Sequence, residues 1–88
     1  MVVSGRCFRF VIDAHPEADA LVRVLTPFAV QGARLSEVSA VGGERGLSIR
    51  LETEGLDEVR AGVLLQRLRN LPVVIRAGLG WREAASAA

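Results

Sequence analysis

Residues 6–13 read Arg-Cys-Phe-Arg-Phe-Val-Ile-Asp, a run in which large apolar side chains fall on every second position. Phe8, Phe10 and Ile12 would therefore lie on one face of a β-strand, with smaller and polar side chains on the other. Residues 47–52, Leu-Ser-Ile-Arg-Leu-Glu, repeat this alternation and are its clearest instance in the chain. The two segments predict two strands that bury their apolar faces in one core.

The segment after the first strand has the spacing of a helix. Apolar residues recur every three or four positions from Ala18 to Ala29, and Pro16 suits the first turn because its missing N–H would have no partner there. Gly32 is typical of a helix end. Pro27 cannot donate a hydrogen bond within the helix, so we expect a kink or a broken last turn.

A second helix is predicted after Asp57, which is a natural N-cap. Asn70 and Pro72 mark its end. Its apolar stripe consists of Ala61, Leu64, Leu65, Leu68 and Leu71.

Three further segments complete the chain. Residues 33–41 predict a strand with a bulge near Glu37, because apolar residues there are spaced by three and then by two positions. Residues 42–46 predict a hairpin loop, and residues 73–79 a fourth strand. We expect one domain over residues 1–88, with a core of about residues 6–81 and a flexible tail at 82–88.

The predicted order of elements is β-α-β-β-α-β. Two split βαβ units with right-handed crossovers are the simplest solution, which makes the expected class α+β with a ferredoxin-like sandwich. A four-stranded antiparallel sheet would carry both helices on one face. The open face is expected to show Arg9, Val11, Ser48, Arg50, Glu52 and Arg76.

Composition limits the classes of function. A net charge of +1 over 88 residues does not favour nucleic-acid binding. No apolar run is long enough for a membrane span. The single cysteine, Cys7, points to a reducing compartment, so we expect a cytoplasmic protein.

Catalytic and metal chemistry are not predicted. Cys7 and His15 are the only cysteine and histidine, and one strand would separate them by about 26 Å, too far for a catalytic dyad. One histidine and one cysteine cannot form the usual transition-metal clusters. The glycines match neither a phosphate loop nor a dinucleotide fingerprint, so no cofactor is expected. An RNA-binding sheet of this topology would need aromatic rings on its open face, whereas Phe8 and Phe10 are in phase with the buried set.

The most informative segment for binding is Asp13-Ala14-His15-Pro16-Glu17-Ala18-Asp19, where the first strand gives way to the first helix. A helix N-terminus can hold a carboxylate, and a nearby acidic side chain can take an amine, so an amino acid is one candidate ligand. Capping is the alternative, because the acidic residues here already place negative charge at this helix end. Trp81, after the last strand, has two interpretations as well: packing at the sheet margin or a subunit interface.

The element order, the proline in this loop, the run at residues 20–25, Gly32, Leu35 and Val38 together resemble the ACT domain. The length and layout are similar to the short small subunits of acetolactate synthase, and His15-Pro16-Glu17 resembles their Asn-Pro-Glu at the helix start. The resemblance implies a non-catalytic regulatory subunit that forms a homodimer through edge strands. It also implies a large thiamine-diphosphate-dependent catalytic partner in branched-chain amino acid biosynthesis.

The same resemblance implies an amino acid effector site at Asp13, His15, Asp19 and Ala20, with the second strand of a neighbouring chain opposite. Asp19 stands where ligand-binding members carry a glycine. Its side chain would crowd the ligand, and its charge opposes a carboxylate. Asp19 therefore argues against binding of an amino acid effector. Two alternatives to an acetolactate synthase subunit are a free-standing amino-acid-sensing ACT protein and, second, an RNA-binding module of the same topology.

Overall fold

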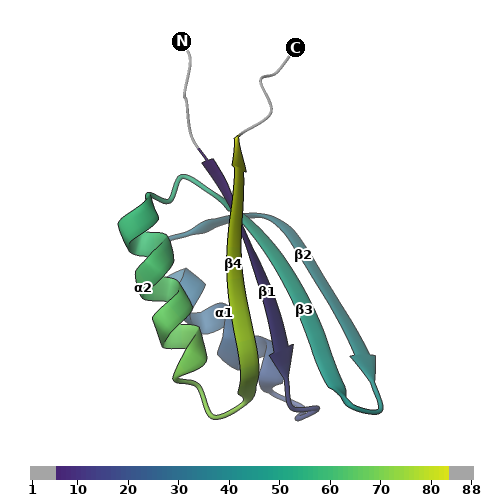
Figure 1. The fold of residues 1–88 in the computed structure, drawn as a ribbon. Coiled ribbons are helices and arrows are strands. Elements are labelled where there is room, and N and C mark those ends of the chain that lie inside the picture. The colour runs from purple at the N-terminus through teal and green to yellow at the C-terminus, as the bar shows by residue number, and fades with distance from the viewer. Residues whose placement is uncertain (1–5, 84–88) are drawn as a thin grey trace.

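Six elements follow one another along residues 6–83, the part of the chain that this computed structural model describes, in the predicted order (Figure 1). They are β1 (Arg6–Ala14), α1 (Ala20–Val30), β2 (Arg34–Gly43), β3 (Gly46–Glu54), α2 (Glu58–Arg69) and β4 (Val74–Glu83). Neither helix in this part is long and apolar enough to cross a membrane.

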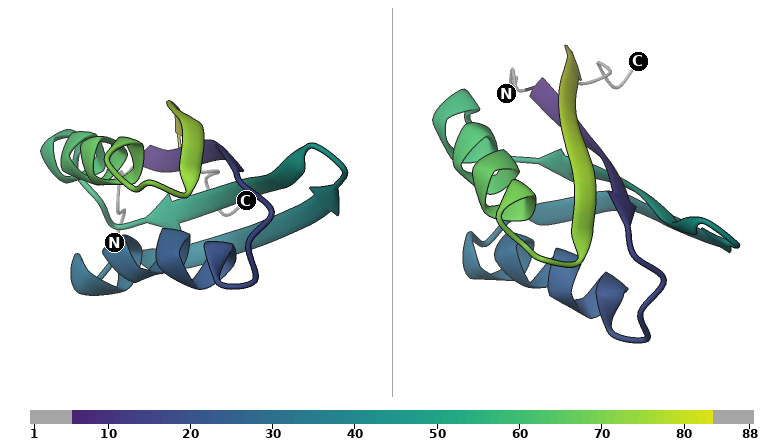
Figure 2. Two further views of the ribbon diagram at one scale, coloured as in Figure 1. Left: turned by 90° about the horizontal axis from the view of Figure 1, so that it is seen from below. Right: turned by 60° about the horizontal axis from the view of Figure 1, so that its bottom comes forward.

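The strands form one antiparallel sheet in the order β2-β3-β1-β4. Both helices pack on the same face of this sheet, as Figures 1 and 2 show from three directions. The expected ferredoxin-like fold is thus confirmed. The turn end of the β2–β3 hairpin projects beyond the layer of helices (Figure 2). Residues 41–45 at this end are exposed.

The core lies between the two central strands and the helices. Phe8, Phe10 and Ile12 of β1 are buried on the helix side, which confirms the alternation predicted for residues 6–13. The Phe10 ring meets the Phe28 ring of α1 edge to face, with centroids 4.9 Å apart and planes at 90°. Each buried side chain of this size stabilises the fold by about 1.5–3 kcal/mol.

The β2 bulge lies where the spacing of apolar residues predicted it. The register of β2 against β3 shifts between Leu35 and Glu37, which leaves Ser36 as the extra residue. The Ser36 hydroxyl donates to the backbone oxygen of Glu52 at 3.3 Å. The hairpin is tighter than predicted: Gly43 pairs with Gly46, so the loop is two residues long rather than spanning 42–46.

The start of α1 differs from the prediction. The helix begins at Ala20, several residues after Pro16, because the intervening backbone bonds elsewhere. The His15 N–H donates to the Val73 oxygen at 2.8 Å, and the Glu17 N–H donates to the His15 oxygen at 2.8 Å. Pro27 does not break the last turn, since α1 continues to Val30.

The second helix and the last strand differ from the predictions in one respect. The Asp57 carboxylate caps α2, accepting a hydrogen bond from the Arg60 N–H at 2.7 Å, as expected. Strand β4 continues to Glu83, so the predicted boundary of the core at residue 81 is too early. Residues 82 and 83 belong to the strand rather than to a tail, and residues 84–88 lie outside the described part of the chain.

Candidate functional site

The loop between β1 and α1 is held by its backbone. Besides the hydrogen bonds of His15 and Glu17, the Ala20 N–H donates to the Glu17 oxygen at 3.0 Å. Val73, which receives the His15 N–H, is buried next to β4. The loop therefore has a fixed path, while the side chains of His15, Glu17 and Asp19 remain exposed to solvent.

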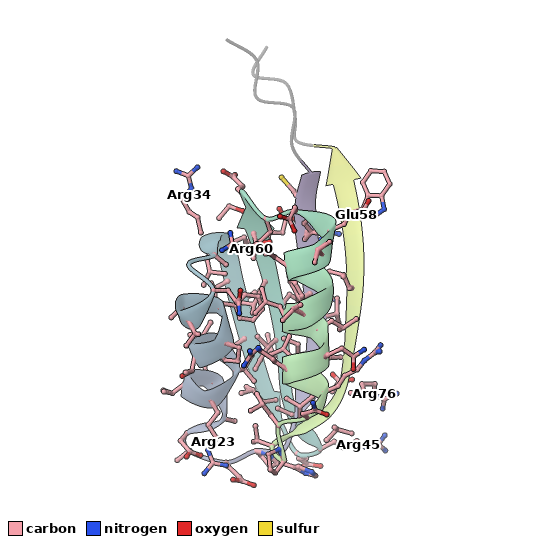
Figure 3. The ribbon with its side chains drawn as sticks, turned by 90° about the vertical axis from the view of Figure 1, so that its left-hand side faces the viewer. Arg23, Arg34, Arg45, Glu58, Arg60 and Arg76 are labelled. Carbon is pink, nitrogen blue, oxygen red and sulfur yellow. The ribbon has the colours of Figure 1, made fainter. Side chains whose placement is uncertain are left out.

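Asp19 occupies the N-cap position of α1, but its side chain makes no capping hydrogen bond. It pairs instead with Arg23 one turn later, with 2.8 Å between Nε and Oδ2. Arg23 also lies 3.9 Å from the Glu17 carboxylate, at the end of the molecule where Figure 3 labels it. Asp19 therefore contributes charge but no capping hydrogen bond at this helix end, and the negative charge of the loop is partly neutralised. No acceptor within residues 6–83 is found for the N–H groups of Leu21 and Val22.

Asp13, near the end of β1, points to the open face of the sheet, away from the helices. It forms an ion pair with Arg76 of β4, with 3.0 Å between its Oδ2 and the arginine Nε. The two residues line a hollow of about 260 Å³ together with Arg45 and Ser48 of the β2–β3 hairpin. Both arginines are labelled at the same end of the molecule in Figure 3. This hollow can accept an anion only in competition with the Asp13 carboxylate.

Gly46 holds the hairpin against the end of β1. Its φ is +146°, and a Cβ at this position would lie 2.5 Å from the backbone oxygen of Ala14. Real Cβ atoms essentially never approach another atom to less than 3.0 Å, so only glycine fits without a shift. The contact positions Arg45, the preceding residue, beside the Asp13–Arg76 pair.

The structure places the four predicted effector-site residues in different surroundings. Asp13 points to the open face, His15 and Asp19 are exposed in the loop, and Ala20 is buried in the core. Ala20 can thus contribute backbone and shape but no exposed side chain. Sequence reasoning missed the arginines that accompany these residues. The spacing of four between Asp19 and Arg23 could have revealed one of them, whereas the position of Arg76 depends on the strand register.

A second hollow, of about 180 Å³, lies at the middle of the open face beside the β2 bulge. It is lined by Arg9, Glu37, Arg50, Leu51 and Glu52. Arg9 donates to one Glu52 carboxylate oxygen from Nη2 at 2.7 Å and from Nε at 3.2 Å. Glu52 lies on the predicted face but, contrary to the open setting expected for it, is only 8% exposed.

The open face carries charged groups, small polar groups and the apolar side chain of Val11. No aromatic residue of the described strands points to it, since Phe8 and Phe10 are buried and Trp81 pairs with Phe8. The arrangement used by base-stacking RNA-binding sheets is thus not found there. Trp81 is 55% exposed at the margin of the sheet. Within residues 6–83 no group of three or more histidine, cysteine or acidic residues converges as metal ligands.

Comparisons with known proteins agree with this architecture. A family model for the ACT-like domain matches residues 4–86. Among solved structures, the fold is similar to the solution structure of the C-terminal domain of the MgtC protein from Mycobacterium tuberculosis, with a TM-score of 0.73. That similarity covers 100% of this chain and 99% of the other at 13% sequence identity, so it is a likeness of fold. The search of curated proteins finds no significant match.

Proposed function

The chain belongs to the ACT-like domain family, and on that premise we propose that it is a non-catalytic regulatory or assembly subunit that works as a homodimer joined along β2. Domains of this family are in general regulatory, small-molecule-binding and non-catalytic. The observation that carries the proposal is the difference between the two edges of the sheet. One edge is open to pairing, and the other carries a charged side chain bonded to it.

The open edge is the outer side of β2. Residues 38–43, Val-Ser-Ala-Val-Gly-Gly, contain no charge and no proline, and they follow the bulge, so their ladder is regular. Val38 is 45% exposed and Val41 65% exposed. A long, uncharged edge strand presents unpaired backbone N–H and C=O groups that favour pairing with another strand. A second copy of β2, antiparallel to the first, satisfies these groups and covers both valines.

The other edge, β4, is less able to pair. Arg69 of α2 donates two hydrogen bonds to the Ala77 oxygen of β4, from Nε at 3.1 Å and from Nη2 at 3.0 Å. The register of β4 against β1 also shifts beside Ala14. A charged side chain at an edge and a local irregularity both hinder the addition of a strand. Dimerisation through β2 is therefore favoured over dimerisation through β4.

Sedimentation velocity tests this dimer. We expect the wild type to be at least a dimer and Ala40→Asp to lose the β2 contact, because two like charges would meet near the two-fold axis. Ala40 is exposed, so the substitution should leave folding intact. Ala18→Asp, the same change at an exposed loop position, is the matched control and should keep the wild-type mass. A monomeric wild type, or an Ala40→Asp variant that assembles like the wild type, would refute edge pairing.

An effector site at the start of α1 is the second part of the proposal. The N–H groups of Leu21 and Val22 are oriented to receive a carboxylate, and the pairing of Arg23 with Asp19 reduces the repulsion that such a ligand meets. His15 is the proposed side-chain contributor, with β2 of the partner opposite, whereas Asp13 points to the open face and pairs with Arg76. Calorimetry with valine, isoleucine and leucine tests this site. No heat with any of them would eliminate these three as effectors.

The partner enzyme is the third part. The resemblance of His15-Pro16-Glu17 and of the overall layout to acetolactate synthase small subunits supports a large thiamine-diphosphate-dependent enzyme in the cytoplasm. Co-purification with a candidate large subunit, followed by an acetolactate synthase assay with and without this chain, tests that assignment. An unchanged rate and no complex would leave a free-standing amino-acid sensor as the preferred function.

A further inference from the structure

Glu37 of β2 and Arg50 of β3 are the starting point for an inference about assembly. Both line the hollow at the middle of the open face, and both are exposed. The register pairs Arg50 with Ser39 and Glu37 with Glu52, so Arg50 and Glu37 are diagonal neighbours on adjacent strands. Such neighbours are within reach of long side chains. Even so, within residues 6–83 neither forms an ion pair.

Most of the other charges described on this face are paired within the chain, and the exception is Arg45 in the hairpin turn at its end. The pairs are Arg9 with Glu52, Arg76 with Asp13, and Arg34 with Glu54, at 2.7, 3.0 and 3.9 Å. At the middle of the open face, Arg50 and Glu37 thus lie side by side at the rim of a hollow without ion-pair partners among the described residues.

We propose that the open face of the sheet docks onto the same face of a second copy of this chain, through reciprocal ion pairs between Arg50 of each copy and Glu37 of the other. A two-fold axis brings every residue i of one copy opposite residue j of the other, and j opposite i. Arg50 and Glu37 of each chain would therefore form two identical pairs. The arrangement is self-complementary and closes without further copies.

The shape of the face permits this approach. Gly78 and Gly80 of β4 carry no side chains, and a Cβ at either position would meet nothing within 4 Å. Val11 beside them is 41% exposed and gains an apolar contact when the face is covered. On the open face, the positions of β4 at Gly78 and Gly80 therefore offer no side chain that would hold a second sheet away.

The area buried between the copies determines which assembly is stable. Four strands about 4.8 Å apart and about 30 Å long give a face of roughly 600 Å², or about 1,200 Å² over two copies, the lower limit for a specific interface. Pairing two chains along β2 doubles the face and brings Glu37 and Arg50 near its centre. Stacking of two edge-paired dimers into a tetramer is then within the normal range. The inference rests in this respect on the β2 pairing of the proposed function.

Reversal of charge tests the stacking by sedimentation equilibrium. We expect a wild type with four times the 9.4 kDa chain mass. Glu37→Arg and Arg50→Glu should each raise the tetramer-to-dimer dissociation constant by at least about tenfold, because two like charges then face each other twice. The double variant Glu37→Arg with Arg50→Glu should restore the tetramer. Glu44→Arg, the same charge change in the exposed hairpin turn, should have no effect.

The outcomes separate the two contacts. A wild type that is only a dimer, broken by Ala40→Asp but not by Glu37→Arg, overturns the stacking and leaves edge pairing standing. Assembly broken by Glu37→Arg and indifferent to Ala40→Asp supports the stacking and overturns edge pairing. A monomeric wild type, or a double variant that stays dissociated, overturns the stacking.

Discussion

Replacing Gly46 with alanine should be the most damaging single-methyl change among the glycines that the structure describes. At φ +146° a residue with a Cβ is strained, which costs about 1–3 kcal/mol. The new Cβ would lie 2.5 Å from the Ala14 oxygen, so backbone on both sides must shift by about half an ångström to reach the 3.0 Å minimum. Forced shifts of packed groups add about 1–3 kcal/mol. We expect the free energy of unfolding to fall by about 3 kcal/mol.

Two other glycines provide comparisons for the loss of stability expected from Gly46→Ala. Gly32 has φ +68° with nothing within 4 Å of a built Cβ, so Gly32→Ala incurs backbone strain alone, about 1–2 kcal/mol. Gly78 has neither a positive φ nor a close neighbour, and Gly78→Ala should change stability by less than about 0.5 kcal/mol. The expected order of destabilisation is Gly46, then Gly32, then Gly78.

Urea denaturation of the three variants and the wild type, at one protein concentration because assembly adds to apparent stability, measures these differences. For a domain of this size, a loss of 3 kcal/mol corresponds to a fall in Tm of about 12–24 °C. If Gly46→Ala unfolds no more easily than Gly32→Ala, the close approach of the hairpin to Ala14 does not limit stability and the reasoning fails.

Three further predictions concern the core, a helix end and a sheet edge. Ile49→Asp puts a charge in a fully buried site and should unfold the domain, whereas Arg50→Asp on the open face should leave it folded. Circular dichroism distinguishes the two outcomes. Equal behaviour of the two variants would show that the faces of β3 are misassigned. Asp57→Ala removes the α2 cap and should lower the free energy of unfolding by about 1 kcal/mol in urea titration; no loss would mean that the cap adds nothing. Arg69→Ala removes the two hydrogen bonds to the Ala77 oxygen, so we expect the free energy of unfolding to fall by about 1 kcal/mol. The edge of β4 is then open to pairing, and we expect larger assemblies in light scattering. Unchanged assembly would show that this edge needs no protection.

Local physics explains what the sequence predicted well. Alternation in residues 6–13 and 47–52 records which side of each strand meets the helices, so the burial of Phe10 and Ile49 follows directly. The spacing of Leu35 and Val38 records the bulge, because an extra residue must change the phase of the strand. These features depend on nearest neighbours along the chain.

What the sequence did not predict depends on contacts between distant segments. The start of α1 moved to Ala20 because the His15 N–H bonds to Val73, which is far away in the sequence. Glu52 became buried through Arg9, its partner on another strand. The candidate site changed for the same reason: the partner of Asp13 is set by the β1–β4 register, which no local pattern encodes.

The asymmetry between the two sheet edges would limit the size of the proposed assembly. If β2 and β4 were both open, chains could add head to tail and form an open-ended sheet. With Arg69 bonded to the Ala77 carbonyl of β4, pairing of β2 with β2 uses one edge per chain and closes at two copies. The proposed stacking of open faces through Glu37 and Arg50 would also be two-fold and self-limiting. If both proposed contacts form, the assembly closes at four chains, and a regulatory subunit built this way would present a fixed number of effector sites to its partner.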